Sequence, residues 1–304
     1  MTDNGGRTSP VEHGFPHLET VRAALTALFR RLTAEGIGAY ALSISPAEAA
    51  FGPAEDLHLG AHRVASAVVR ALRLPDARMV VSFRPMRDAA TVELTAGPEY
   101  FVEVNDRFRL HRRDLAAALS HEVTHVLLHR LGLGFADTAA NEILTDTAAA
   151  FLGSGWLLLD AYREDGLTHQ KLGYLTPEEF GYVLARRARY FGEDPAPWFS
   201  SPQAYEAYVR GRALADREAR RAPLAAAGAG ERRRYTRARR TGSAPPRGAA
   251  YRFGRDGDGE GGGDGVLRVS FPCPVCGQWL RVPAGGGALR ARCGLCRTVL
   301  ECEV

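Results

Sequence analysis

The segment HEVTHVLLH, residues 121–129, places three histidines at intervals of four residues around one glutamate. On a helix, His121 and His125 lie one turn apart on the same face, so both imidazoles can reach one metal ion. His129 lies about 12 Å along the helix axis from His121, too far to bind the same ion on an unbroken helix. Glu122 projects beside the pair, where a carboxylate can act as a base toward water. The pattern predicts half of a catalytic metal site; the alternative is a histidine-rich helix with a structural role only.

A second motif, NEILTD at residues 141–146, begins sixteen residues after His125, on the next expected helix. Its glutamate, Glu142, can supply a third metal ligand. Asp146 lies one turn further along the same face, where it can accept a hydrogen bond from the far nitrogen of a liganding histidine. Three protein ligands leave a fourth position for water, as a catalytic zinc ion requires.

Together the two motifs resemble the gluzincin peptidases, in which HExxH is followed by a helix that carries NExx(S/T)D. The resemblance covers the 26 residues from position 121 to position 146. It implies that His121, His125 and Glu142 bind a catalytic Zn²⁺. It also implies that Glu122 is the general base and that Asp146 supports a liganding histidine from behind.

The same resemblance implies hydrolysis of a peptide or protein substrate, in which zinc polarises the carbonyl and Glu122 transfers a proton to the leaving amine. A donor that stabilises the oxyanion is expected downstream, and the sequence offers Tyr174, Tyr182 and His169. The strand-like run 99–105 is expected to offer a free edge to an extended peptide. SprT-type proteases fit less well, because they take a third histidine downstream and none occurs between His129 and His169.

The C-terminal cysteines form a second metal-ligand pattern. Two CxxC motifs are separated by sixteen residues and supply Cys273, Cys276, Cys293 and Cys296. Each motif forms a tight knuckle whose thiolates face one ion, and two knuckles make a closed tetrahedral site. Gly277 and Gly294 suit the knuckle turns, and residues 266–304 look like a zinc ribbon. Its Zn²⁺ is expected to be structural, and Cys302 to be a small strand residue.

The spacing of apolar residues predicts an α+β domain over residues 17–209, and the gluzincin resemblance implies that this domain is zincin-like. Helices are expected at residues 17–37, 59–72, 112–131, 137–164 and 176–191. Three strand-like runs predict a small antiparallel meander before the HExxH helix, at residues 78–83, 90–96 and 99–105. The stretch Gly153-Ser154-Gly155 is expected to kink its helix or to allow close packing.

Composition changes outside this domain. Residues 1–16 are expected to be a disordered tail, and residues 210–265, poor in large apolar side chains, a flexible linker before the ribbon. From Arg210 to Arg255 fourteen arginines face three acids, a local net charge of 14 − 3 = +11, whereas the whole chain carries +4. Such a linker can give nucleic acid a non-specific footprint together with the ribbon, or be a solvated spacer. Four acids beside the ribbon would oppose phosphate: Asp256, Asp258, Glu260 and Asp264.

The N-terminus contains no apolar signal-peptide core, and the longest apolar run, residues 148–162, is shorter than the ~20 residues of a membrane span. A cytoplasmic protein with no membrane partner is therefore expected. In a reducing compartment, clustered cysteines indicate metal binding. The leading hypothesis is a zinc metallopeptidase. The alternatives are a nucleic-acid- or protein-binding zinc-ribbon protein with a non-catalytic zincin scaffold, and a DNA-recruited protease of the SprT type.

Overall fold

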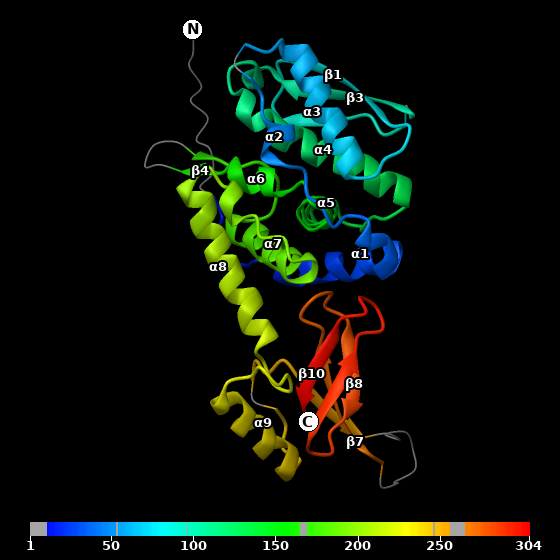
Figure 1. Cartoon of the computed structure of the whole chain (residues 1–304), viewed down its shortest axis with the longest axis vertical. Coiled ribbons are helices and arrows are strands. Elements are labelled where there is room, and N and C mark those ends of the chain that lie inside the picture. Colours follow the sequence, from blue (N-terminus) through cyan, green and yellow to red (C-terminus); the bar gives the residue numbers. More distant parts are fainter. Residues whose placement is uncertain (1–10, 53, 96, 165–168, 246, 256–264) are drawn as a thin grey trace.

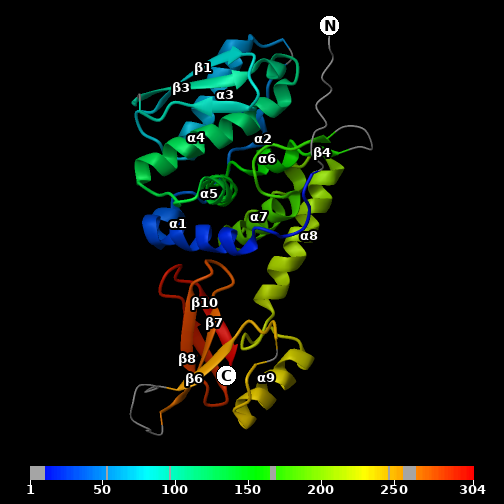
Figure 2. The ribbon, with the colours of Figure 1, turned by 180° about the vertical axis from the view of Figure 1, so that it is seen from behind.

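The computed structural model describes residues 11–52, 54–95, 97–164, 169–245, 247–255 and 265–304, with the backbone alone at residue 169. The molecule is elongated, with helices and a small sheet at one end and the cysteine module, residues 266–304, at the other (Figures 1 and 2). The content of helices and strands agrees with the predicted α+β class. No helix within the described ranges is long and apolar enough to cross a membrane.

The elements keep their order along the chain. The helices are α1 (Leu18–Gly38), α2 (Pro46–Ala49), α3 (Leu57–Ala71), α4 (Leu115–Leu131), α5 (Thr138–Leu152), α6 (Trp156–Asp160), α7 (Pro177–Phe191), α8 (Pro202–Ala219) and α9 (Ala229–Thr241). Short 3-10 turns are η1 (Asp106–Arg109), η2 (Arg112–Asp114) and η3 (Ala196–Trp198). The strands are β1 (Arg78–Arg84), β2 (Ala90–Val92), β3 (Glu99–Asn105), β4 (Arg163–Glu164), β5 (His169–Gln170), β6 (Arg252–Arg255), β7 (Leu267–Pro272), β8 (Trp279–Pro283), β9 (Ala288–Arg292) and β10 (Val299–Glu303).

The N-terminal sheet has the strand order β1-β3-β2, in which β1 and β3 are parallel and β2 and β3 are antiparallel. The predicted antiparallel meander is therefore wrong, and residues 99–105 form the central strand instead of a free edge. The chain crosses over the end of β3 through residues 85–89. There the Asn105 side chain donates hydrogen bonds to the carbonyls of Met86 and Asp88. This side-chain anchor fixes a crossing that turn residues alone do not specify.

Helix α4 lies at the centre of the N-terminal part and contacts α3, α5 and β2. Twelve of its 17 residues are buried, which explains why its sequence is apolar on nearly every side. It ends at Gly132, whose φ of +57° is in the left-handed region. Helix α5 begins with Asp137, whose side chain accepts a hydrogen bond from the Ala140 amide. These local signals set the ends of the two motif-bearing helices, which lie side by side (Figure 1).

The single helix predicted over residues 137–164 is divided into α5 and α6. Gly153, with a φ of +107°, ends α5 in the left-handed region. Gly155 then passes so close to α5 that a Cβ atom would lie 2.4 Å from the amide nitrogen of Ala150. The glycine-rich stretch therefore both breaks the helix and allows close packing, which are the two roles that the sequence suggested.

The predicted N-terminal tail is ordered where it is described. Val11 is buried. The His13 ring lies 3.1 Å from Glu164 and 3.3 Å from Glu178, and the Gly14 amide donates to Glu178. These contacts hold residues 11–16 against the helices, so the tail prediction is wrong for this segment. Residues 1–10 lie outside the described residues.

The predicted flexible linker also folds where it is described. Residues 210–219 complete α8, α9 follows, and β6 pairs with β7 of the cysteine module. The Ala225 amide donates to the carbonyl of Glu301 in β10 over 2.9 Å. The aromatic residues of this segment, Tyr235, Tyr251 and Phe253, form a cluster with ring centroids 5.1–5.5 Å apart. This cluster supplies buried apolar surface to a segment whose low apolar content had suggested disorder. Residues 246 and 256–264 lie outside the described residues, and independent folding of the predicted domains stays a prediction.

The cysteine module rests on the N-terminal part through polar contacts to its first loop. The Thr26 hydroxyl of α1 donates to the carbonyl of Cys276 over 2.7 Å. The buried guanidinium of Arg186 in α7 donates to the carbonyl of Val275 over 3.1 Å. Both contacts use backbone atoms of the module, so they depend on the shape of the loop that carries its cysteines.

Candidate metal centres

Two helices bring the donor atoms of His121, His125 and Glu142 together. The two Nε2 atoms of the histidines lie 3.0 Å apart. Oε2 of Glu142 lies 3.2 Å from Nε2 of His121 and 3.3 Å from Nε2 of His125. Donors bound tetrahedrally at about 2.0–2.1 Å from one ion are separated by about 3.3 Å. The three atoms therefore have the spacing of ligands on one face of a tetrahedral metal site.

Hydrogen bonds on the far side of each ring determine which nitrogen is free. Nδ1 of His121 lies 2.8 Å from Oδ1 of Asp146, and because an ionised carboxylate only accepts, this Nδ1 carries the hydrogen. Nδ1 of His125 lies 3.3 Å from the Thr145 hydroxyl, whose own hydrogen is donated to the carbonyl of Asn141. This Nδ1 is therefore also the donor. In the neutral rings the lone pairs of both Nε2 atoms face the same position, so a cation bound there is stabilised by both.

Asp146 connects α5 to the loop before α7. It is fully buried, and its Oδ2 accepts hydrogen bonds from the amides of Tyr174 and Leu175, the latter over 3.0 Å. A Cβ atom on Gly173 would lie 2.6 Å from Oδ2, and its φ is +81°, so glycine is required there. The Tyr174 ring stacks beside His121, with ring centroids 6.2 Å apart. One carboxylate thus positions a ligand and a neighbouring phenol.

Glu122 lies beside the two histidines on α4, with 6% of its surface exposed. Burial raises the pKa of its carboxyl group, and the charges of His121 and His125 partly oppose this rise. Within the described part of the chain, no residue forms a hydrogen bond with its carboxylate. The carboxylate is therefore free to accept a hydrogen bond from a water molecule.

The carboxylates stabilise positive charge at the donor atoms. Burial lowers the pKa of His121, but Asp146 and Glu142 outweigh this effect and raise it to about 10. Burial raises the pKa of Glu142, but the two histidines outweigh this effect and lower it to about 2. Both shifts favour a cation between the side chains, whether a proton or a metal ion.

Comparison with known proteins identified no relative of this chain. The chain matches no family model, no curated protein and no solved structure. What the site does is therefore inferred from its residues and their geometry.

The other residues that the sequence singled out differ in their position relative to the donor group. His129 is exposed near the end of the unbroken helix α4, outside the donor group, as its distance along the axis predicts. Tyr182 is fully buried and its hydroxyl donates to Glu218 over 2.6 Å, so it is committed to a different cluster. The side chain of His169 lies outside the described residues. Tyr174 is the candidate donor whose ring the described structure places beside the histidines.

Two residues at the site had not been singled out by sequence reasoning. Thr145 fixes the tautomer of His125, and a signal was available, since it lies in the NEILTD motif next to Asp146. Asp88 lies in the connection between β1 and β2, and its charge raises the pKa of Glu122 and Tyr174. No local pattern marks Asp88, because the crossing of the sheet brings it to the site.

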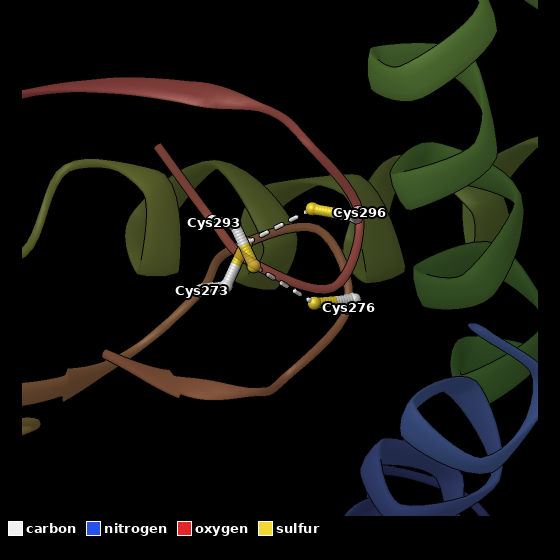
Figure 3. A group of neighbouring side chains, drawn as sticks. All are labelled: Cys273, Cys276, Cys293 and Cys296. Carbon is white, nitrogen blue, oxygen red and sulfur yellow. Dashed lines mark hydrogen bonds between the residues drawn. The ribbon is translucent and has the colours of Figure 1, made fainter. Parts of the chain in front are cut away.

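The four cysteines form the second group, where two loops of the cysteine module meet (Figure 3). The sulfur atoms of Cys273 and Cys296 lie 3.6 Å apart, as do those of Cys276 and Cys293. Sulfurs bound at about 2.3 Å from zinc are separated by about 3.8 Å, whereas a disulfide requires about 2.05 Å. The spacing fits four thiolates around one ion. Cys302 is buried in β10 outside this group, where a small strand residue was expected.

The two cysteine loops share one backbone pattern. In the first loop the amide of Cys273 donates to the carbonyl of Gln278, and the carbonyl of Cys273 accepts from the amide of Gly277. In the second loop the amide of Cys293 donates to the carbonyl of Thr298, and its carbonyl accepts from the amide of Arg297. Gly277 occupies the left-handed position of the first loop with a φ of +77°, as predicted. In the second loop Arg297 takes this position with a φ of +64°, whereas Gly294 lies in the knuckle turn of residues 294–296 without a positive φ. The loops are matched by hydrogen bonding and differ in residue type.

Proposed function

We propose that this chain is a zinc-dependent peptidase of the gluzincin type, which hydrolyses peptide bonds in a peptide or protein substrate. The observation that carries the proposal is the triangle of donor atoms from His121, His125 and Glu142. Beside it lies the carboxylate of Glu122, which has no hydrogen-bond partner among the described residues. The four cysteines would hold a second, structural Zn²⁺ in a zinc ribbon, since a closed tetrahedral shell leaves no position for substrate.

Each residue of the first group has a separate task. Bound zinc would supply a Lewis acid for the scissile carbonyl and for a water molecule. Glu122 accepts the proton of that water and passes it to the leaving amine. Asp146 holds the hydrogen on Nδ1 of His121, so that Nε2 stays unprotonated. Burial raises the pKa of Tyr174, so its phenol keeps the proton with which it can stabilise the oxyanion.

The exposed edge of the sheet suggests how a substrate would be aligned. Among the described residues, β2 pairs with β3 on one side and with no strand on the other, and α4 contacts it. An extended peptide can add to such an edge through main-chain hydrogen bonds, which lie beside the helix that carries Glu122. β2 thus replaces residues 99–105 as the expected substrate strand.

Metal dependence tests this function. The zinc-loaded chain should cleave an unfolded, fluorescently labelled protein, and 1,10-phenanthroline should abolish cleavage until Zn²⁺ is restored. The 1,7-isomer, which does not chelate, is the control for inhibition by the aromatic ring. Cleavage that continues after metal analysis shows both sites to be empty would contradict the proposal.

Asp146→Asn should weaken zinc binding at the histidine site about 10- to 100-fold, as loss of a ligand's supporting hydrogen bond does elsewhere. Asp146 accepts from His121 on one oxygen and from two backbone amides on the other. An asparagine must place its NH₂ group against one of these donors in either orientation. Zinc content after dialysis against increasing chelator concentrations measures the effect.

The matched control is Asp137→Asn, the same exchange at the start of the same helix. Asparagine caps a helix as well as aspartate does, so zinc retention should be unchanged. Equal zinc retention by the two variants would show that Asp146 does not support the site.

A further inference from the structure

Helix α9 has two different sides. It contains six arginines and one glutamate in 13 residues. Tyr235 and Ala238 are buried, whereas Arg233, Arg237 and Arg240 are exposed. At about 100° per residue these three arginines fall within a sector of about 60°, on the side opposite Tyr235. They extend over about 10 Å of the helix axis. We call them the arginine row.

The arginine row is held in a fixed position. The Tyr235 ring lies 5.1 Å from the ring of Tyr251 and 5.5 Å from that of Phe253, which attaches α9 to β6. Arg232 forms an ion pair of 2.9 Å with Glu303 at the end of β10. The row is therefore displayed on a folded helix attached to the cysteine module, and not on the flexible arm that the sequence suggested.

The guanidinium groups of the arginine row have no partner within the described part of the chain: none of them forms a hydrogen bond or an ion pair there. Their spacing of three and four residues brings like charges together, which destabilises a helix. A surface hollow of about 570 Å³ runs along the row and is lined by α9 and Glu303. An anion in this hollow would relieve the repulsion.

A second cluster of arginines differs from the arginine row because its guanidinium groups have partners within the molecule. It lines a cleft of about 970 Å³ between α1 and the cysteine module. There Arg22 and Arg186 both form ion pairs with Glu218, and Arg30 donates to Gln278 over 3.1 Å. Arg30, and Arg186 through the carbonyl of Val275, connect the N-terminal part of the molecule to the cysteine module, whereas Arg22 pairs with α8. The arginine row has no such contacts with the described residues.

We propose that the arginine row binds the phosphodiester backbone of a nucleic acid. Guanidinium groups match phosphate oxygens with paired donors, and several of them along one axis suit a polymer that carries a charge at regular intervals. Apart from arginines, the polar side chains that line the hollow are Thr236, Thr241 and Glu303, which pairs with Arg232, and none of them is an amide that could read base edges. Binding is therefore independent of sequence. This site is separate from the proposed peptidase site and does not depend on it.

A membrane surface fits the arginine row less well. A helix that lies on a bilayer inserts an apolar side beneath the headgroups. The apolar side of α9 is already buried against Tyr251 and Phe253, and the opposite side carries arginines and threonines. The arginine row can contact phosphates at the surface of a bilayer, but this side of α9 carries no large apolar side chain that could enter the bilayer.

Binding of fluorescently labelled 20-mers to the full-length, zinc-loaded chain tests the proposal. Duplex DNA, single-stranded DNA and single-stranded RNA of mixed sequence are compared over a range of salt concentrations. Replacing Arg233, Arg237 and Arg240 together by glutamine should weaken binding more than about tenfold at 0.1 M salt. It should also reduce the slope of log K against log salt by about 2 to 3, which corresponds to three lost phosphate contacts. Replacement by lysine should keep most of the slope, because the charge remains.

The matched control replaces Arg70, Arg73 and Arg107 by glutamine. They are exposed and form no side-chain hydrogen bond or ion pair with described residues. They lie in or next to α3 and η1, at the end of the molecule opposite α9 (Figure 1). Zinc content and circular dichroism verify folding. Equal losses in the two glutamine variants would overturn the proposal, as would an unchanged slope in the arginine-row variant. Binding to phosphatidylserine vesicles without binding to any of the three nucleic acids would also overturn it.

Discussion

Glu142→Ala should lower the zinc content of the chain from two ions to one, whereas His129→Ala should leave both ions bound. Glu142 supplies the only oxygen of the donor triangle and comes from α5, so its loss leaves two histidines from a single helix. His129 lies on the same helix as those histidines, yet it is exposed and outside the triangle. Zinc per chain, measured by mass spectrometry after gel filtration, separates the two outcomes.

The comparison is informative because both variants should fold. The Glu142 side chain is 19% exposed, so its truncation creates no closed cavity in the core. Cleavage of the unfolded protein substrate should disappear with the zinc in Glu142→Ala and persist in His129→Ala. If His129→Ala lost zinc and Glu142→Ala retained it, helix α4 would have to be broken in solution, and the gluzincin proposal would be wrong.

The elements that carry the donors could be predicted because their signals are local. His121 and His125 are one helical turn apart, and Glu142 and Asp146 are one turn apart on the next helix. Caps and breaks near each helix fix these positions: Asp137 begins α5, and Gly132 ends α4. The distances between the donor atoms then follow from the packing of α4 on α5, which the pairing of the two motifs had indicated.

What the sequence could not predict depends on contacts between distant residues. The order of the N-terminal strands depends on Asn105 holding the connection that contains Met86 and Asp88. Tyr182 could not be separated from Tyr174 as an oxyanion donor, because its partner Glu218 lies 36 residues away on α8.

The segment that contains α9 has the composition of a linker. It folds because Tyr235, Tyr251 and Phe253 meet, and because β6 finds β7. The composition shows that aromatic residues are scarce in this segment, but it does not show that they pack against one another in the folded chain. The arginine row could be recognised only after this convergence had placed α9 on the cysteine module.

Glu122→Gln should retain both zinc ions and reduce peptide hydrolysis by about 10²- to 10⁴-fold, the usual contribution of a positioned acid or base. The donor triangle does not include Glu122, and glutamine has nearly the same volume, so the ligands should keep their places. A neutral amide is also easier to bury than a carboxylate at a site that is 6% exposed. Stability should therefore be equal or higher, as a thermal melt would show.

Zinc content and activity together identify the role of Glu122. Glu206→Gln is the control, because Glu206 is an exposed acid of α8 and belongs neither to the N-terminal sheet nor to the donor triangle. It should change neither zinc content nor hydrolysis. Loss of zinc in Glu122→Gln would make Glu122 part of the metal shell, in conflict with the donor triangle. Full activity with zinc bound would show that another group takes the proton from water. Retained zinc with lost activity is expected only if the base is a different side chain from the three ligands.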